Sequence, residues 1–152
     1  MSPADDEVRR FLADSMVAGV AAMSPAGRPF ITPLWFVYHR GAIHLPTGGA
    51  SLAARYVAAQ PAVVLLFHAE RRLSSKRVLR MRGEAAIRQG MPSWAILLPL
   101  VRKYYLSSVS RGLWPYLRRY ELVSRYYRQN PEPGPVVIEV CPRSWEFIAR
   151  VA

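Results

Sequence analysis

Strand-like segments separated by turn residues recur along most of this chain, and no other feature restricts its fold as much. Short apolar or alternating runs that end at glycine, proline or serine are typical of β-strands. The apolar faces of such strands must be buried, and closing a sheet on itself removes exposed edges. The pattern therefore predicts a small antiparallel barrel. Its six strands are expected at residues 17–24, 29–38, 41–45, 62–67, 76–88 and 134–140.

Helical patterns occur at three places between these strands. Residues 5–15 carry apolar side chains at helical spacing behind an acidic first turn, which predicts a short amphipathic helix. A second helix is expected over residues 51–60, between the third and fourth strands, with Ser51 at its start. Residues 92–129 have helical spacing and predict an insertion before the last strand. Within the long fifth strand, Gly83 indicates a bulge.

Length and composition are those of one domain spanning residues 1–152. The single cysteine, Cys141, excludes an intramolecular disulfide and a zinc site built from cysteines. Residues 5–7 are acidic where a signal peptide would be basic, and the apolar run at 94–101 is too short to span a bilayer. We therefore expect a cytoplasmic protein without a membrane span.

The chain has a net charge of +11, which favours anionic ligands without choosing among them. Arginines and tyrosines are concentrated in the insertion at 92–129. One interpretation is that this segment binds nucleic acid or an anionic membrane surface through stacking and phosphate contacts. The other is a helical pair whose arginines face water. Because the chain carries no recognised nucleic-acid motif, nucleic acid is the less favoured partner.

A Thr-Gly-Gly loop at residues 47–49 leads directly into the helix that opens at Ser51. Unpaired backbone N–H groups at a helix N-terminus attract phosphate, and glycines allow a ligand to approach the backbone. The loop is also compatible with an ordinary connection in which Ser51 only caps the helix. Both interpretations stay open on these residues alone.

The other candidate chemistry is weak. His39, His44 and His68 lack the spacing of metal ligands, so we expect no metal site. No motif around a serine nucleophile is present, and we expect no catalytic side chain.

The order of several motifs resembles a known family. The stretch PAGRPFITPLWFVYHRGAIHLPTGGASLAARYVAAQPAVVLL, followed by RVLRMRGEAAI and VVIEVCPRSWEF, is similar to the core of the pyridoxamine 5′-phosphate oxidase-like superfamily, the flavin-binding split β-barrels. The resemblance covers most of the chain outside the insertion. It implies an α+β fold, mainly β: a six-stranded antiparallel split β-barrel with a helical insertion before the last strand.

The resemblance also implies a function. Such proteins are homodimers that hold FMN or the 5-deazaflavin coenzyme F-420 in a cleft between subunits. The implied activity is that of a flavin- or deazaflavin-dependent oxidoreductase acting on a small organic substrate. The ring would lie along the second strand, and the phosphate would lie at the loop and helix start. Contacts to the cofactor are expected from Thr32, Trp35, Thr47, Ser51, Arg55 and Trp145.

One position departs from the family pattern. Many members have a lysine two residues after the helix-opening serine, and this chain has Ala53 there. Arg55 is expected to supply the missing charge, with Arg77 or Arg82 as substitutes. The alternative is a member that has lost its flavin and binds haem or another tetrapyrrole, nucleic acid or an anionic surface.

Overall fold

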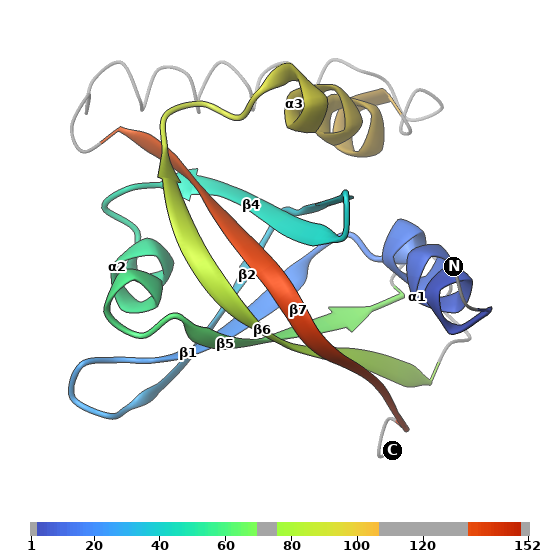
Figure 1. Cartoon of the computed structure of the whole chain (residues 1–152), viewed down its shortest axis with the longest axis horizontal. Helices are drawn as coiled ribbons and strands as arrows, with labels where there is room; N and C mark the ends of the chain where they lie inside the picture. Colours follow the sequence, from blue (N-terminus) through green and yellow to red (C-terminus); the bar gives the residue numbers. More distant parts are fainter. Residues whose placement is uncertain (1–2, 70–75, 107–133, 150–152) are drawn as a thin grey trace.

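The computed structural model describes residues 3–69, 76–106 and 134–149, and these form one seven-stranded antiparallel sheet with three α-helices around it (Figure 1). The strand order is β2-β1-β5-β6-β7-β4-β3. The strands are β1 Ala18–Met23, β2 Pro29–Leu34, β3 Val37–His39, β4 Ala42–Gly48, β5 Ala62–His68, β6 Arg77–Gln89 and β7 Pro135–Ala149. The helices are α1 Pro3–Asp14, α2 Leu52–Ala59 and α3 Trp94–Val101, the last continued by the π-helical turn η1 Arg102–Leu106.

The mainly β fold with helices is confirmed, but there are seven strands instead of six. The segment predicted as one strand at 29–38 is divided at Trp35 and Phe36 into β2 and β3. β2 pairs with β1 and β3 pairs with β4, so the two halves lie at opposite edges of the sheet. Hydrogen bonds therefore do not close the sheet, and the covalent chain joins its two edges. The chain has to leave its pairing with β1 before it can pair with β4, and this change of partner breaks the strand at Trp35 and Phe36.

The last strand is longer than predicted. It continues beyond residue 140 to Ala149, although Pro142 lacks an N–H for the ladder. The pairing of β6 with β7 shifts between Arg82 and Gly83, where Gly83 lies opposite Pro142 and Arg82 opposite Ser144. The predicted bulge at Gly83 is therefore confirmed, and the irregularity accommodates the proline.

One hydrophobic core lies inside the curved sheet. Its fully buried side chains alternate along the strands, as strand geometry requires. The largest of them are Phe36, Phe67, Ile43, Leu45, Leu65 and Leu79. The predicted amphipathic helix is present as α1, whose Val8, Phe11 and Leu12 pack into the same core.

A smaller cluster attaches α3 to the sheet. Ile96 and Leu100 of α3 pack with Val37 and with the buried Tyr104 of η1. The predicted insertion at 92–129 is therefore helical over residues 94–106, and its remainder lies outside the described residues. Within the described part of the chain, no helix is long and apolar enough to cross a membrane.

The bulge generates a prediction about stability. A Cβ atom at Gly83 would lie 2.6 Å from the carbonyl oxygen of Cys141 and 2.8 Å from Cγ1 of Val140. We expect Gly83→Ala to lower the free energy of unfolding by about 1–3 kcal/mol, since the backbone of β7 must move. Urea unfolding measures this change. Gly19→Ala is the matched control, because a Cβ there meets its nearest atoms at 3.6 Å. Equal effects of the two substitutions would contradict the steric explanation.

Candidate functional site

The loop between β4 and α2 is held at both ends by backbone hydrogen bonds. The Gly49 N–H donates to the carbonyl oxygen of Gly134 at 2.7 Å, and the Ser51 N–H donates to that of Gly48 at 3.0 Å. The Ser51 hydroxyl accepts a hydrogen bond from the Ala54 N–H at 3.2 Å, which confirms Ser51 as the N-cap of α2. Thr47 lies just before this loop on β4 and is half-buried. The hydroxyl protons of Thr47 and Ser51 remain available as donors to a ligand.

The helix α2 presents one apolar and one polar side. Ala53, Ala54 and Val57 face the sheet and are buried, whereas Arg55 is exposed. The Arg55 guanidinium forms no ion pair within the described part of the chain. Ala53 is only 2% exposed and belongs to the core, so a lysine in its place would have to leave the core to reach a ligand. The free cation next to the loop is therefore Arg55.

The structure brings the elements that carry four of the predicted residues into contact. Thr32 lies on β2, which contacts β4, the strand of Thr47. The perpendicular rings of Phe30 and Tyr56, whose centroids are 5.1 Å apart, connect β2 to α2. Contacts thus connect β2, the strand of Thr32, to β4 and to α2, and Thr47 and Ser51 lie on either side of the turn that joins β4 to α2.

The two predicted tryptophans have packing partners elsewhere. The Trp35 ring stacks on Tyr104 with centroids 4.5 Å apart, in the cluster under α3. Trp145 lies on β7 and packs edge-to-face against Tyr38 at 6.0 Å. Both tryptophans are half-buried, and a contact of either with a cofactor stays a prediction.

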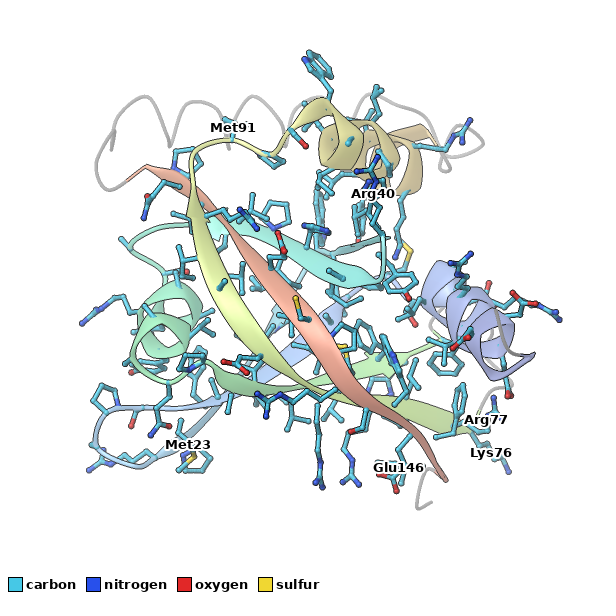
Figure 2. The ribbon with its side chains drawn as sticks, viewed as in Figure 1. Met23, Arg40, Lys76, Arg77, Met91 and Glu146 are labelled. Carbon is cyan, nitrogen blue, oxygen red and sulfur yellow. The ribbon has the colours of Figure 1, made fainter. Side chains whose placement is uncertain are left out.

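The substitute cations differ in availability. Arg77 is bound to Glu7 at 2.6 Å, and its guanidinium lies 3.9 Å from the centre of the Phe147 ring, near the end of β7 (Figure 2). Arg82 lines a groove of about 760 Å³ on the outer face of β1, β2 and β5. Arg143 lines the same groove and pairs with Glu84. Arg82 therefore faces a cavity, whereas Arg77 is engaged by Glu7.

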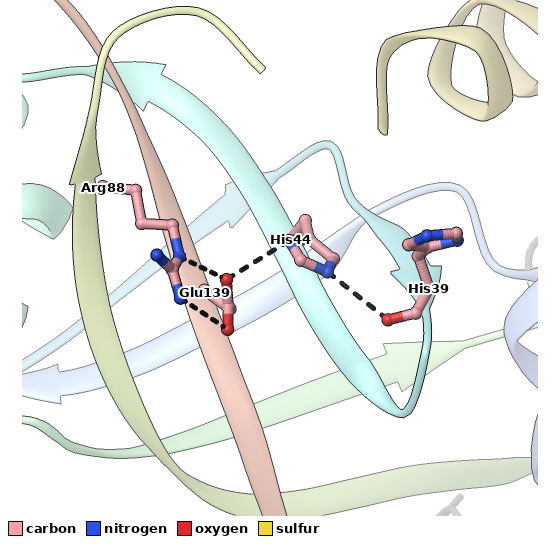
Figure 3. Close-up of polar contacts among 4 residues, drawn as sticks. All are labelled: His39, His44, Arg88 and Glu139. Atoms are coloured by element: carbon pink, nitrogen blue, oxygen red, sulfur yellow. Dashed lines mark hydrogen bonds and ion pairs between the residues drawn. The ribbon is translucent and has the colours of Figure 1, made fainter. Parts of the chain in front are cut away.

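Sequence reasoning did not anticipate a polar network on β4, β6 and β7 (Figure 3). Glu139 accepts two hydrogen bonds from Arg88, at 2.6 and 3.4 Å, and its carboxylate lies 4.0 Å from Nδ1 of His44. Nε2 of His44 donates to the carbonyl oxygen of His39 at 3.4 Å. These residues line a second cavity of about 470 Å³. No local sequence motif indicates this network. It becomes visible only from the strand register, which pairs His44 with Glu139.

This network does not resemble a metal centre. Within residues 3–69, 76–106 and 134–149, no three His, Cys, Asp or Glu side chains gather as metal ligands would. The Arg88 hydrogen bond lowers the pKa of Glu139, which keeps the carboxylate ionised. Burial lowers the pKa of His44, and the hydrogen bond to His39 and the charge of Glu139 offset part of that effect.

The lowered pKa of His44 gives a pH-dependent contribution to stability. The unfolded chain binds a proton at this histidine more readily than the folded chain, so stability falls as the pH drops below roughly 6.5. We expect the melting temperature to fall from pH 7.5 to pH 5.5, and His44→Gln to reduce that slope. The control is His68→Gln, at an exposed position on β5. A slope that is unchanged in His44→Gln would contradict this assignment.

Within the described part of the chain, the site around the start of α2 therefore offers hydroxyl donors, two glycines and a guanidinium without an ion-pair partner. Such a set is suited to binding an anionic group.

Many solved structures share this fold, and three of them, each less than a fifth identical to this chain in sequence, illustrate it. A conserved hypothetical protein from Mycobacterium tuberculosis superposes with a TM-score of 0.66 at 19% identity, covering 99% of this chain and 86% of its own. A protein described as an F420 reductase superposes with a TM-score of 0.61 at 18% identity, and the match covers 91% of this chain and 94% of that protein. The haem storage protein HutZ from Vibrio cholerae superposes with a TM-score of 0.62 at 12% identity, and the match covers 96% of this chain and 94% of HutZ. At these identities the likeness shows the fold alone.

Comparison by sequence identifies the family. No curated protein has a sequence that matches this chain significantly. The family model described as pyridoxamine 5′-phosphate oxidase matches residues 4–149, nearly the whole chain, including the site around α2. With the strand order and the capped loop described above, this match shows that the chain belongs to the pyridoxamine 5′-phosphate oxidase family.

Proposed function

We propose that this protein is an oxidoreductase that binds FMN or the deazaflavin coenzyme F-420 and acts on a small organic substrate. The observation that carries the proposal is the anchored loop at residues 47–51 with the unpaired guanidinium of Arg55 beside it. The family and an F420 reductase among the structural neighbours support the same class of cofactor.

The residues at the loop fit a phosphate group. Gly48 and Gly49 have no side chains, so a phosphate oxygen can approach their backbone. The Ser51 hydroxyl already accepts from the Ala54 N–H, and its own proton is free to donate to an oxygen of the ligand. Arg55 adds a charge-assisted contact from the next turn of α2.

The neighbouring strand fits the flat, apolar part of such a cofactor. β2 is an edge strand whose outer side has no partner strand within the described sheet. The open edge of β2, the strand of Thr32, carries backbone N–H and C=O groups, and Phe30 with Tyr56 provides an apolar wall toward α2. When bound, the cofactor supplies the transfer of hydride or electron pairs. The protein would bind it, orient it and exclude water, and needs no acid or base of its own.

A homodimer completes this arrangement. The groove on the outer face of β1, β2 and β5 has an apolar lining, and beside it Ile31 is 61% and Met23 41% exposed. Exposed apolar surface of this kind on a sheet favours association. The proposal is that a second copy covers this face and that the cofactor lies at the edge of the contact.

The dimer is tested by changing the exposed face. We expect the wild-type chain to sediment as a dimer and Ile31→Glu to shift it toward monomer, since burying a carboxylate without a partner is unfavourable. Sedimentation velocity over a concentration series measures the change. Ala26→Glu, in the exposed turn between β1 and β2, is the control. A wild-type monomer at all concentrations would contradict the proposed dimer.

Binding of FMN, F-420 and haem tests the proposed cofactor class. Haem is included because one structural neighbour is a haem storage protein. Binding of FMN or F-420 at micromolar concentration supports the proposal, whereas exclusive binding of haem, or millimolar binding of all three, contradicts it. The excess of arginines in the chain favours the polyglutamate tail of F-420. A colourless purified protein that binds added F-420 would distinguish that cofactor from FMN.

The role of Arg55 gives a more specific prediction. Arg55→Ala removes a charge-assisted hydrogen bond and should weaken FMN binding by about ten- to a hundredfold. Riboflavin lacks the phosphate, so its affinity should stay the same in the variant. Titration of both ligands measures the difference, with Arg10→Ala on α1 as the control for net charge. If the variant binds FMN as tightly as the wild type, the loop is only a connection.

A further inference from the structure

The helix α3 has large apolar side chains on its solvent-facing side. Trp94 is 72% exposed and Leu98 61%, and Met91, just before the helix, is 64% exposed. Trp94, Leu98 and Arg102 follow one another at intervals of four residues, so they lie along one side of the helix. We name Met91, Trp94, Leu98 and Arg102 the α3 surface.

The opposite side of α3 already accounts for the packing of the helix. Ile96 and Leu100 are 6% and 9% exposed and contact Val37 and Tyr104. The sequence WAILLPLV contains no charged residue, so the helix is apolar on its outer side as well. Surface helices ordinarily carry polar residues on the side away from the core. Met91, Trp94 and Leu98 therefore form apolar area that the described part of the chain does not bury.

Two arginines lie beside this apolar area. Arg102 is exposed at the end of α3, and Arg40 is exposed in the turn between β3 and β4. Neither guanidinium forms an ion pair within the described part of the chain. Arg40 and Met91 line the same cavity and lie on the α3 side of the molecule (Figure 2). Glu139, the carboxylate of that cavity, is bound by Arg88.

We propose that the α3 surface binds the surface of an anionic lipid bilayer. Apolar side chains on one side of a helix, flanked by arginines, are suited to shallow insertion among lipid headgroups. Tryptophan in particular is stable at such an interface, because its ring is apolar and its N–H can donate. The free arginines match lipid phosphates, each attracted to a negatively charged surface. An apolar protein partner would not use these charges.

Vesicle binding tests the proposal with the full chain. We expect the protein to sediment with vesicles of phosphatidylglycerol and phosphatidylcholine, and not with phosphatidylcholine alone. Leu98→Ser should lower the partition coefficient about tenfold, because it removes apolar area from the contact. Leu52→Ser is the matched control, since Leu52 is an exposed leucine on another helix, 45% exposed. Arg102→Gln should weaken binding about fivefold, and Arg10→Gln, at an exposed position on α1, should not.

Tryptophan fluorescence reports insertion separately. Anionic vesicles should shift the emission of the wild type to shorter wavelength, and Trp94→Phe should abolish most of that shift while vesicle binding persists. The proposal is overturned if the protein fails to bind anionic vesicles, or if Leu98→Ser and Leu52→Ser bind alike. It is also overturned if Leu98→Ser changes the oligomeric state and leaves vesicle binding unchanged, because the surface would then be a contact between copies.

Discussion

The hydroxyl group of Tyr104 holds the point at which the sheet changes direction. This side chain is 2% exposed, and its oxygen accepts a hydrogen bond from the Phe36 N–H at 3.0 Å while lying 2.7 Å from the carbonyl oxygen of Met16. Phe36 separates β2 from β3 and is fully buried, so its N–H has no water to bind. A buried N–H without a partner costs about 1–3 kcal/mol. The tyrosine therefore supplies a partner for the backbone at the strand break.

The candidate site depends on this junction. Because the chain turns between Leu34 and Val37, β2 and β3 lie at opposite edges of one sheet, and β2 comes into contact with β4. That contact joins β2, which carries Thr32, to the strand that leads into the loop before α2. The same tyrosine stacks on Trp35 and lies in the cluster that attaches α3. The position of the proposed cofactor site and that of the α3 surface are thus linked through one side chain.

Local sequence signals predicted much of this fold. The strand-like runs of β1 and β5, the alternation in β6, the serine before α2 and the glycine at the bulge are short-range features that the structure confirms. The break at Trp35 and Phe36 was not predictable, because both residues favour strands and only the distant partner strands require the break. The extension of β7 was missed because Pro142 indicates an end to the strand, and only the opposite Gly83 shows otherwise. The break at Trp35 and Phe36 accounts for seven strands where six were predicted.

The candidate site was predicted unevenly for the same reason. Ser51 as a cap follows from neighbouring residues, and the structure confirms it. The burial of Ala53 and the exposure of Arg55 depend on which side of α2 faces the sheet, which the helix alone does not determine. The network of His44, Arg88 and Glu139 depends on strand register, because His44 pairs with Glu139, which lies 95 residues further along the sequence.

A crystal structure of the protein with FMN tests the central claim most directly. We predict that the phosphate lies at the loop before α2, within hydrogen-bonding distance of the Ser51 hydroxyl and the Arg55 guanidinium, with the ring along β2. A phosphate bound instead in the groove beside Arg82 and Arg143 would contradict this account, and so would a cofactor in the cavity lined by His44 and Glu139.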